Sequence, residues 1–474
     1  MSIIPPPPPG DASTVSEPAA RRVPEGLTLG AAAVFGAVLL LAVLLFASAR
    51  SGSQITEAAA DDTPTPSVSA QGSGPTGGSG AGSGFGDLPP SAGGSDDDEQ
   101  STTTTEPGDD SPAPGGGGGE PPADESEVEP LECPEGVEQV ICDAAEFVQR
   151  ARGRPFKTFP VVEVMEDSQF DRELLADFDE YEADLDTDDV TLTALGLLDP
   201  ELSLAAVFRD SLEVGVVGFY DPETGQLVVR GRDLSLYAQL VLVHELVHAF
   251  DDQWFDLNRS DFPDDEADYG FSAVVEGNAS RVERRWRGQL SSADQAILNR
   301  EESLALSPED LERLLSLPPV VQDLQFSPYI DGATYVSSLA AAGGEAAVDA
   351  ALTEPPLTSE EVLHPAISRA VEPELTVPAP PADGPVIDEG RIGELLLRLW
   401  LGRASSQGWG GDRFVTWQAD GLDCIRVDLV GDDDQETGEM SVAARTWAGL
   451  LPTTRSVEET TIDGRQAIRI SACH

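Results

Sequence analysis

The chain has 474 residues, and 86 acidic side chains against 28 lysines and arginines give it a formal net charge of −58. A nucleic-acid-binding protein needs a basic surface to meet the phosphates, so this charge excludes that class. It also disfavours a protein held at a membrane surface by a basic patch. The length exceeds one ordinary domain of about 100–200 residues, so we expect several parts.

The N-terminal part predicts a membrane anchor. Residues 1–26 form a proline-rich tail, and residues 27–49 are an uncharged apolar stretch, long enough as a helix to cross a hydrocarbon layer of about 30 Å. Two arginines precede this stretch and one follows it, so the positive-inside rule leaves the tail in the cytoplasm. We therefore expect a single-pass protein of the cell membrane whose later residues are extracellular. A signal peptide cleaved after residues 47–49 and a twin-arginine export signal at residues 21–22 are the alternatives.

The remaining chain divides by composition. Residues 50–130 are rich in Gly, Ser, Pro and Asp, which predicts a disordered acidic linker that cannot bury enough apolar surface to fold. We expect one domain over residues 131–372 and, after a proline-rich break, a C-terminal α+β lobe over residues 387–474.

All four cysteines follow the apolar stretch. An even number on the exported side indicates disulfides, for which three pairings exist. Local spacing favours Cys133–Cys142 and Cys424–Cys473, one bridge near each end of the folded part.

The periodicity of apolar residues predicts an α+β fold. A hairpin around the turn at residues 221–225 precedes a helix that runs from an N-cap at Asp233 to about residue 252. A second long helix is expected over residues 266–290. Other helices are expected at 137–151, 168–181, 203–214, 389–401 and 440–449, and strands at 160–165, 216–220, 226–230, 414–418, 424–430 and 466–472.

The sequence His244-Glu245-Leu246-Val247-His248 lies within the first of these two long helices, which is apolar on nearly every side. Two histidines four residues apart share one helix face, so both imidazoles can reach one metal ion. Glu245 stands beside the first of them, where a carboxylate can act as the base that takes a proton from an attacking water. Polar groups in an apolar helix are costly unless something compensates them, and a Zn²⁺ ion would do so.

A catalytic zinc needs a third protein ligand and an open fourth position. Glu276 lies on the second long helix among small and apolar residues, which would let the two helices approach closely. We therefore predict Glu276 as the third ligand. Asp268, two turns earlier near the same face, is the alternative.

H-E-x-x-H followed by a glutamate on a later helix resembles the gluzincin branch of zinc metallopeptidases, which has the thermolysin-like architecture. The resemblance implies a mainly helical, zincin-like catalytic domain with a small sheet or hairpin, in which metal-activated water attacks a peptide carbonyl. Many gluzincins carry an aspartate where this chain has Ser280, so Asp251, Asp252 or Asn278 is expected to orient an imidazole instead. Residues from Gly218 to about Ser368 also resemble a little-characterised family of predicted exported bacterial zinc metallopeptidases, through the segments 218–221, 244–253, 275–277, 328–332 and 363–365, and the resemblance extends to residues 408–413.

These features predict a membrane-anchored extracellular zinc endopeptidase that acts on a peptide or protein substrate. The negative charge on the attacked carbonyl oxygen needs a donor, for which His364 and Tyr329 are the candidates and Tyr335 the third choice. The hairpin before the metal-binding helix is expected to offer an edge strand to an extended peptide. The alternatives are a non-catalytic cell-surface protein with a structural or decayed zinc site, and a hydrolase of other amides. A structural zinc usually has four protein ligands rich in Cys, and no Cys is near either helix in the sequence.

Overall fold

The computed structural model describes residues 128–260, 262–366, 373–450 and 455–474, without the side chains of residues 176–184 and 186. The predicted tail, membrane helix and nearly all of the linker lie outside these ranges. Among the described residues, none of the helices combines the length and the apolar character needed to cross a bilayer.

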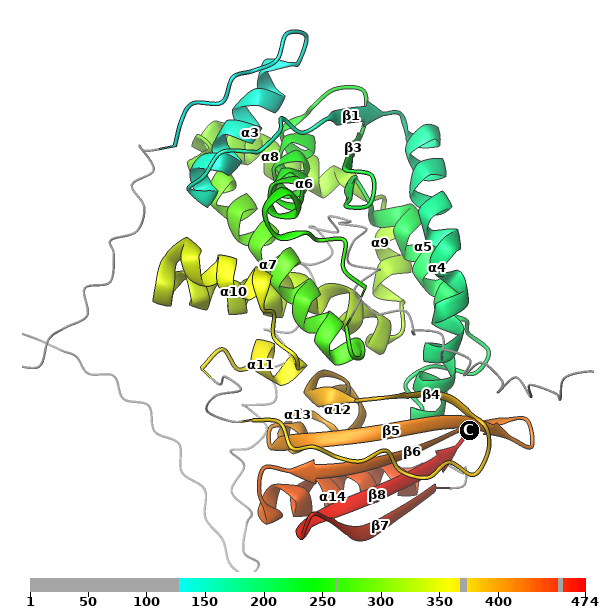
Figure 1. The fold of residues 1–474 in the computed structure, drawn as a ribbon. Helices are drawn as coiled ribbons and strands as arrows, with labels where there is room; N and C mark the ends of the chain where they lie inside the picture. The colour runs from blue at the N-terminus through cyan, green and yellow to red at the C-terminus, as the bar shows by residue number, and fades with distance from the viewer. Residues whose placement is uncertain (1–127, 261, 367–372, 451–454) are drawn as a thin grey trace, which may run out of the picture. The chain divides into compact units, whose positions relative to one another are not determined.

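The described chain mixes helices with two separate sheets, which confirms the predicted α+β class (Figure 1). The first sheet has the strand order β1-β3-β2, in which β1 (Val162–Met165) pairs parallel and β2 (Gly218–Asp221) antiparallel with β3 (Gln226–Arg230). Strands β2 and β3 are the predicted hairpin. The strand β2 therefore lies at one edge of this sheet, directly before the helix that carries the two histidines.

The two long helices of the sequence analysis are α6 (Leu236–Phe255) and α7 (Asp265–Gln289). The predicted N-cap Asp233 is wrong, because the Ser235 side chain accepts the hydrogen bond from the Ala238 amide. Helix α6 is buried on every side, with one apolar cluster joining it to the first sheet, to α7 and to α3 (Gln139–Arg152). Its nearly continuous apolar sequence is thus explained by its central position.

Helix α7 also packs closely on α10 (Pro319–Thr353). A Cβ added to Gly277 would overlap the backbone of Gly332, and one added to Gly332 would overlap the backbone of Ala273. Glycines at this crossing let the two backbones touch. Helix α10 is interrupted at Gly344, where φ is 67° and ψ is −161°, so its last turns follow a different direction.

The other helices of this part connect or cover these elements. Helix α4 is longer than the predicted 168–181 and ends only at Gly196, which adopts a left-handed C-cap. These helices are α4 (Asp167–Leu195), α5 (Leu204–Gly215), α8 (Ser292–Ala305), α9 (Pro308–Leu315) and α11 (Ser359–Leu363).

The C-terminal region is an antiparallel sheet in the order β4-β5-β6-β8-β7 with helices packed on it. The helix predicted from residue 389 is wrong at its start, because residues 386–390 form the edge strand β4. Strand β7 was not predicted. The elements are β4 (Val386–Gly390), α12 (Gly393–Leu401), α13 (Arg403–Ser406), β5 (Trp409–Ala419), β6 (Leu422–Gly431), α14 (Asp434–Leu450), β7 (Arg455–Ile462) and β8 (Arg465–Cys473).

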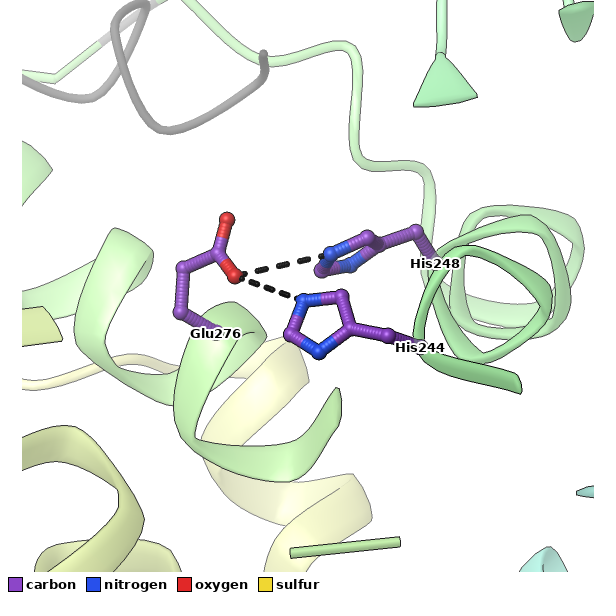
Figure 2. Close-up of side chains that lie close together, drawn as sticks. All are labelled: His244, His248 and Glu276. Carbon is purple, nitrogen blue, oxygen red and sulfur yellow. Dashed lines mark hydrogen bonds and ion pairs between the residues drawn. The ribbon is translucent and has the colours of Figure 1, made fainter. Parts of the chain in front are cut away.

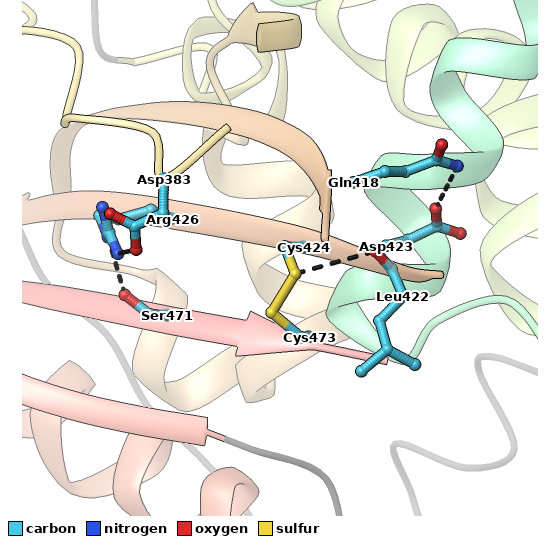
Figure 3. The surroundings of a disulfide bond; sticks show 8 residues. All are labelled: Asp383, Gln418, Leu422, Asp423, Cys424, Arg426, Ser471 and Cys473. Atoms are coloured by element: carbon cyan, nitrogen blue, oxygen red, sulfur yellow. Dashed lines mark hydrogen bonds and ion pairs between the residues drawn. A yellow bond between two sulfur atoms is a disulfide. The ribbon is translucent and has the colours of Figure 1, made fainter. Parts of the chain in front are cut away.

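Both predicted disulfides are confirmed. Cys424 and Cys473 face each other on β6 and β8, with their Cα atoms 4.1 Å apart (Figure 3). The Cα atoms of Cys133 and Cys142 are 5.6 Å apart, at the start of α3. The expected domain boundary between residues 372 and 387 stays a prediction.

Candidate metal centre

The two histidines of the motif project from one face of α6 toward α7 (Figure 2). Both imidazoles are buried, and their ring centroids are 4.8 Å apart. This arrangement follows from the spacing of four residues, which places His244 and His248 one turn apart.

Glu276 extends from α7 to both rings. Its Oε2 atom is 3.1 Å from Nε2 of His244 and 3.5 Å from Nε2 of His248 (Figure 2). Two ligand atoms bound tetrahedrally to one ion at about 2.0–2.1 Å are about 3.4 Å apart, close to both distances. The three residues are a group that can hold a metal ion, with ligand atoms within 4.8 Å of one another. Asp268 does not belong to this group, the single one found among the described residues.

Several buried polar atoms of this group make no hydrogen bond in the described part of the chain. They are both ring nitrogens of His248 and the Oε1 atom of Glu276. Buried polar atoms nearly always have a partner. A metal ion takes lone pairs from neutral imidazole and from carboxylate and displaces the proton on its ligands, so the residues present fit such an ion once His244 has released its proton.

Neighbouring groups in the site shift the pKa values of His244 and Glu276. Burial lowers the pKa of His244, but its hydrogen bonds to Glu276 and Glu283 outweigh burial and raise it to about 10. Burial would raise the pKa of Glu276, but the charge of His248, together with the hydrogen bond and charge of His244, lowers it to about 2. The carboxylate is therefore ionised at neutral pH and attracts positive charge to this point.

Glu283 is the residue of this site that the sequence analysis missed. Its Oε2 atom is 3.1 Å from Nδ1 of His244, and its side chain is buried. The hydrogen bond fixes the ring so that Nε2 faces Glu276. The available signal was its position seven residues after Glu276, two helical turns along the same face.

The residues expected to orient an imidazole have other partners. Asp251 accepts hydrogen bonds from Arg152 at 3.0 Å and from Asn278 at 2.6 Å. Asp252 accepts the hydroxyl of Tyr220 at 2.7 Å.

Glu245 is completely buried beside the metal-binding group. Among the described residues, neither of its carboxylate oxygens has a side-chain hydrogen-bond partner, although the backbone of Tyr220 on β2 is close enough to favour the ionised form. Burial raises the pKa of Glu245 well above its usual range; the charge of His244 opposes this, and the charges of Glu276 and Glu283 add to it. A carboxylate of this kind readily accepts a proton.

Strand β2 lies close to this carboxylate. A Cβ at Gly218 would overlap the Val241 side chain and lie 3.3 Å from Cγ of Glu245. The glycine therefore lets the edge strand pack directly on the helix that carries the base.

The side chains predicted to donate a hydrogen bond to the substrate carbonyl oxygen lie in different surroundings. The Tyr329 ring, on α10, stacks on His244 with centroids 6.0 Å apart and planes inclined by 25°. His364 follows α11, and its Nε2 atom is 2.8 Å from Oε2 of Glu394 on α12. The Tyr335 side chain packs against buried apolar side chains from two separate parts of the core. The structure thus brings Tyr329 to the metal-binding group and pairs His364 with a carboxylate.

Comparisons of the chain with known protein families, with curated proteins and with solved structures found no match.

Proposed function

We propose that the protein is a zinc-dependent endopeptidase in which His244, His248 and Glu276 hold one Zn²⁺ ion. The observation that carries this proposal is the buried Glu245 carboxylate, which has no side-chain hydrogen-bond partner in the described part of the chain and lies next to three converging metal-ligand atoms. Two imidazoles and one carboxylate are a donor set typical of zinc sites that keep a position for a substrate or water.

Bound zinc would supply Lewis acidity toward a water and a substrate carbonyl. Glu245 accepts the proton of the attacking water, and its raised pKa lets it hold that proton and pass it to the leaving amine. Glu283 keeps His244 in the orientation that directs Nε2 to the metal position. Tyr329 donates its hydroxyl to the carbonyl oxygen as negative charge develops there, and His364 is the second candidate donor.

The position of β2 at a sheet edge supports a peptide substrate. An extended peptide can add to such an edge through backbone hydrogen bonds, with its scissile carbonyl near Glu245. The sequence of residues 27–49 supports a membrane anchor, with the catalytic part outside the cell.

The alternative is a non-catalytic surface protein with a structural or decayed site. Structural zinc sites are usually closed by four protein ligands. The group described here has three, and the fully buried Glu245 carboxylate beside them forms no ion pair or side-chain hydrogen bond within the described residues. These two features favour the catalytic proposal.

Zinc content and peptide cleavage by the full chain test the proposal. Glu245→Gln should keep zinc and lose turnover by about 10²–10⁴, because the ligands remain and the base is gone. Glu276→Ala should lose tightly bound zinc. Glu302→Gln is the control, since it alters a buried carboxylate that pairs with Arg287 outside the site. Undiminished cleavage by Glu245→Gln would refute the mechanism.

A further inference from the structure

Directly behind the metal-binding group, five side chains form a closed ring of hydrogen bonds. Arg152 Nε donates to Asp251 at 3.0 Å, and Asn278 Nδ2 donates to the second oxygen of Asp251 at 2.6 Å. Arg281 donates to the side-chain oxygen of Asn278 at 2.9 Å and to both carboxylate oxygens of Glu345 at 2.8 Å. Glu345 closes the ring by accepting from Arg152.

The ring joins four helices at the level of the metal ligands. Asp251 lies on α6, three residues after His248, and Asn278 lies on α7, two residues after Glu276. Arg152 is the last residue of α3, and Glu345 belongs to α10. The break in α10 at Gly344 immediately precedes Glu345, so the altered backbone direction begins where the ring needs this carboxylate.

Arg152 is the centre of this arrangement. Its guanidinium is completely buried and also donates to Asp349 at 2.7 Å, so three carboxylates meet one cation. Buried charges of this kind persist only when each has well-oriented partners. Helix α6 packs largely through apolar contacts, which fix the distance between helices better than their rotation because they have no direction. Its directional contacts outside the ring include the hydrogen bonds of His244 to Glu283 and Glu276. The ring supplies directional contacts between α6 and α7 next to His248 and Glu276.

We propose that Arg152 is a positioning residue for the metal centre, acting through Asp251 and Asn278 to fix α6 against α7 so that His248 and Glu276 face one ion. This inference rests on the proposed zinc site and extends it to a residue 92 positions before the first ligand (244 − 152).

Zinc affinity and the absorption spectrum of the cobalt-substituted full chain test the inference. Arg152→Lys keeps the charge but cannot reach three carboxylates, and Asn278→Ala breaks the link between α6 and α7 without removing a charge. Both should weaken zinc binding and change the cobalt spectrum, by at most the roughly 10–100-fold loss that follows removal of a residue hydrogen-bonded directly to a metal ligand. Because both act in one ring, the double variant should lose less than the two single losses combined.

Arg391→Lys is the matched control. Arg391 is also a buried arginine, paired with Asp264 and Glu374 at the far end of α7. It should lower the unfolding temperature while leaving zinc affinity and the cobalt spectrum unchanged. If the two ring variants behave like this control, Arg152 stabilises the fold without positioning the metal and the inference is wrong. If the unaltered chain binds no zinc, the proposed function fails together with the inference.

Discussion

At the scale of single residues, the proposed metal centre depends on the hydrogen bond between Glu283 and His244. Glu283→Gln keeps the size of the side chain but replaces a charged acceptor with a neutral one. We expect zinc affinity to fall about 10–100-fold, because a carboxylate behind a ligand both orients the ring and increases its basicity. Competition with a chromophoric chelator measures this, with Glu302→Gln as the control. Equal affinities in the two variants would contradict the role of Glu283.

The site could be predicted from the sequence only where the geometry is local. The spacing of His244 and His248 on one helix fixes their common face, and the next helix offers Glu276 among small residues. Glu283 was missed because its role depends on how α7 is rotated toward α6. His364 was singled out, but its partner Glu394 is 30 residues further along and meets it only through the tertiary structure.

The pair of His364 and Glu394 predicts a pH effect. The hydrogen bond to Glu394 raises the pKa of His364, against a smaller opposing effect of burial. The imidazolium form is therefore favoured in the folded protein, and the stability that the pair adds is present at pH below about 6.5 and is lost as pH rises through the raised pKa. Glu394→Gln should move the titration of His364 to lower pH.

An NMR titration can follow this change, because the chain has only four histidines. His364→Ala identifies the resonance. If His364 also stabilises the carbonyl oxygen, the alkaline limb of kcat/KM should shift to lower pH in Glu394→Gln. An unchanged titration would show that Glu394 does not control this imidazole.

At the scale of elements, the crossing of α7 and α10 places Tyr329 beside His244. Gly277→Ala would insert a methyl group into the Gly332 backbone, and overpacking of this kind costs about 1–3 kcal/mol. Gly288→Ala is the matched control on the same helix, since nothing lies within 4 Å of its added Cβ. Gly277→Ala should destabilise the protein and lower kcat, whereas Gly288→Ala should be neutral or stabilising. Denaturant unfolding and peptide cleavage measure the two effects.

The elements that the sequence predicted well have strong local signals. Both α6 and α7 have long apolar or small-residue patterns, and the hairpin has a Pro/Gly turn. The strands predicted wrongly or missed are edge strands, whereas helices α8 to α11 were missed as well. Apolar and polar residues alternate only weakly in residues 386–390 and in β7. Each of these strands pairs with one neighbouring strand, whose position depends on the whole sheet. Such strands are defined by their neighbours more than by their own residues.

At the scale of the whole molecule, the dominant feature is uncompensated negative charge. The net charge is −58, and acidic groups cluster even in the folded part. The pKa of Asp265, at the start of α7, is raised well above its usual range by burial and by the charges of Asp388, Asp268 and Asp264. The destabilisation by Asp265 is therefore present above its raised pKa and disappears when pH falls below the ordinary value of about 3.9.

Self-repulsion of this size predicts a stability that depends on salt. The Debye length shortens from about 30 Å at 0.01 M to about 10 Å at 0.1 M, so added NaCl screens repulsion between separate acidic groups. The unfolding temperature at pH 7 should therefore rise with NaCl. Asp265→Asn should raise it at low salt and reduce the further gain from salt, because one half-buried charge is removed from the cluster. The control is Asp433→Asn. Asp433 is exposed and accepts hydrogen bonds from two backbone amides of its own turn, so its substitution should leave the salt dependence nearly unchanged. An unfolding temperature independent of NaCl would mean that these charges are already compensated within the fold.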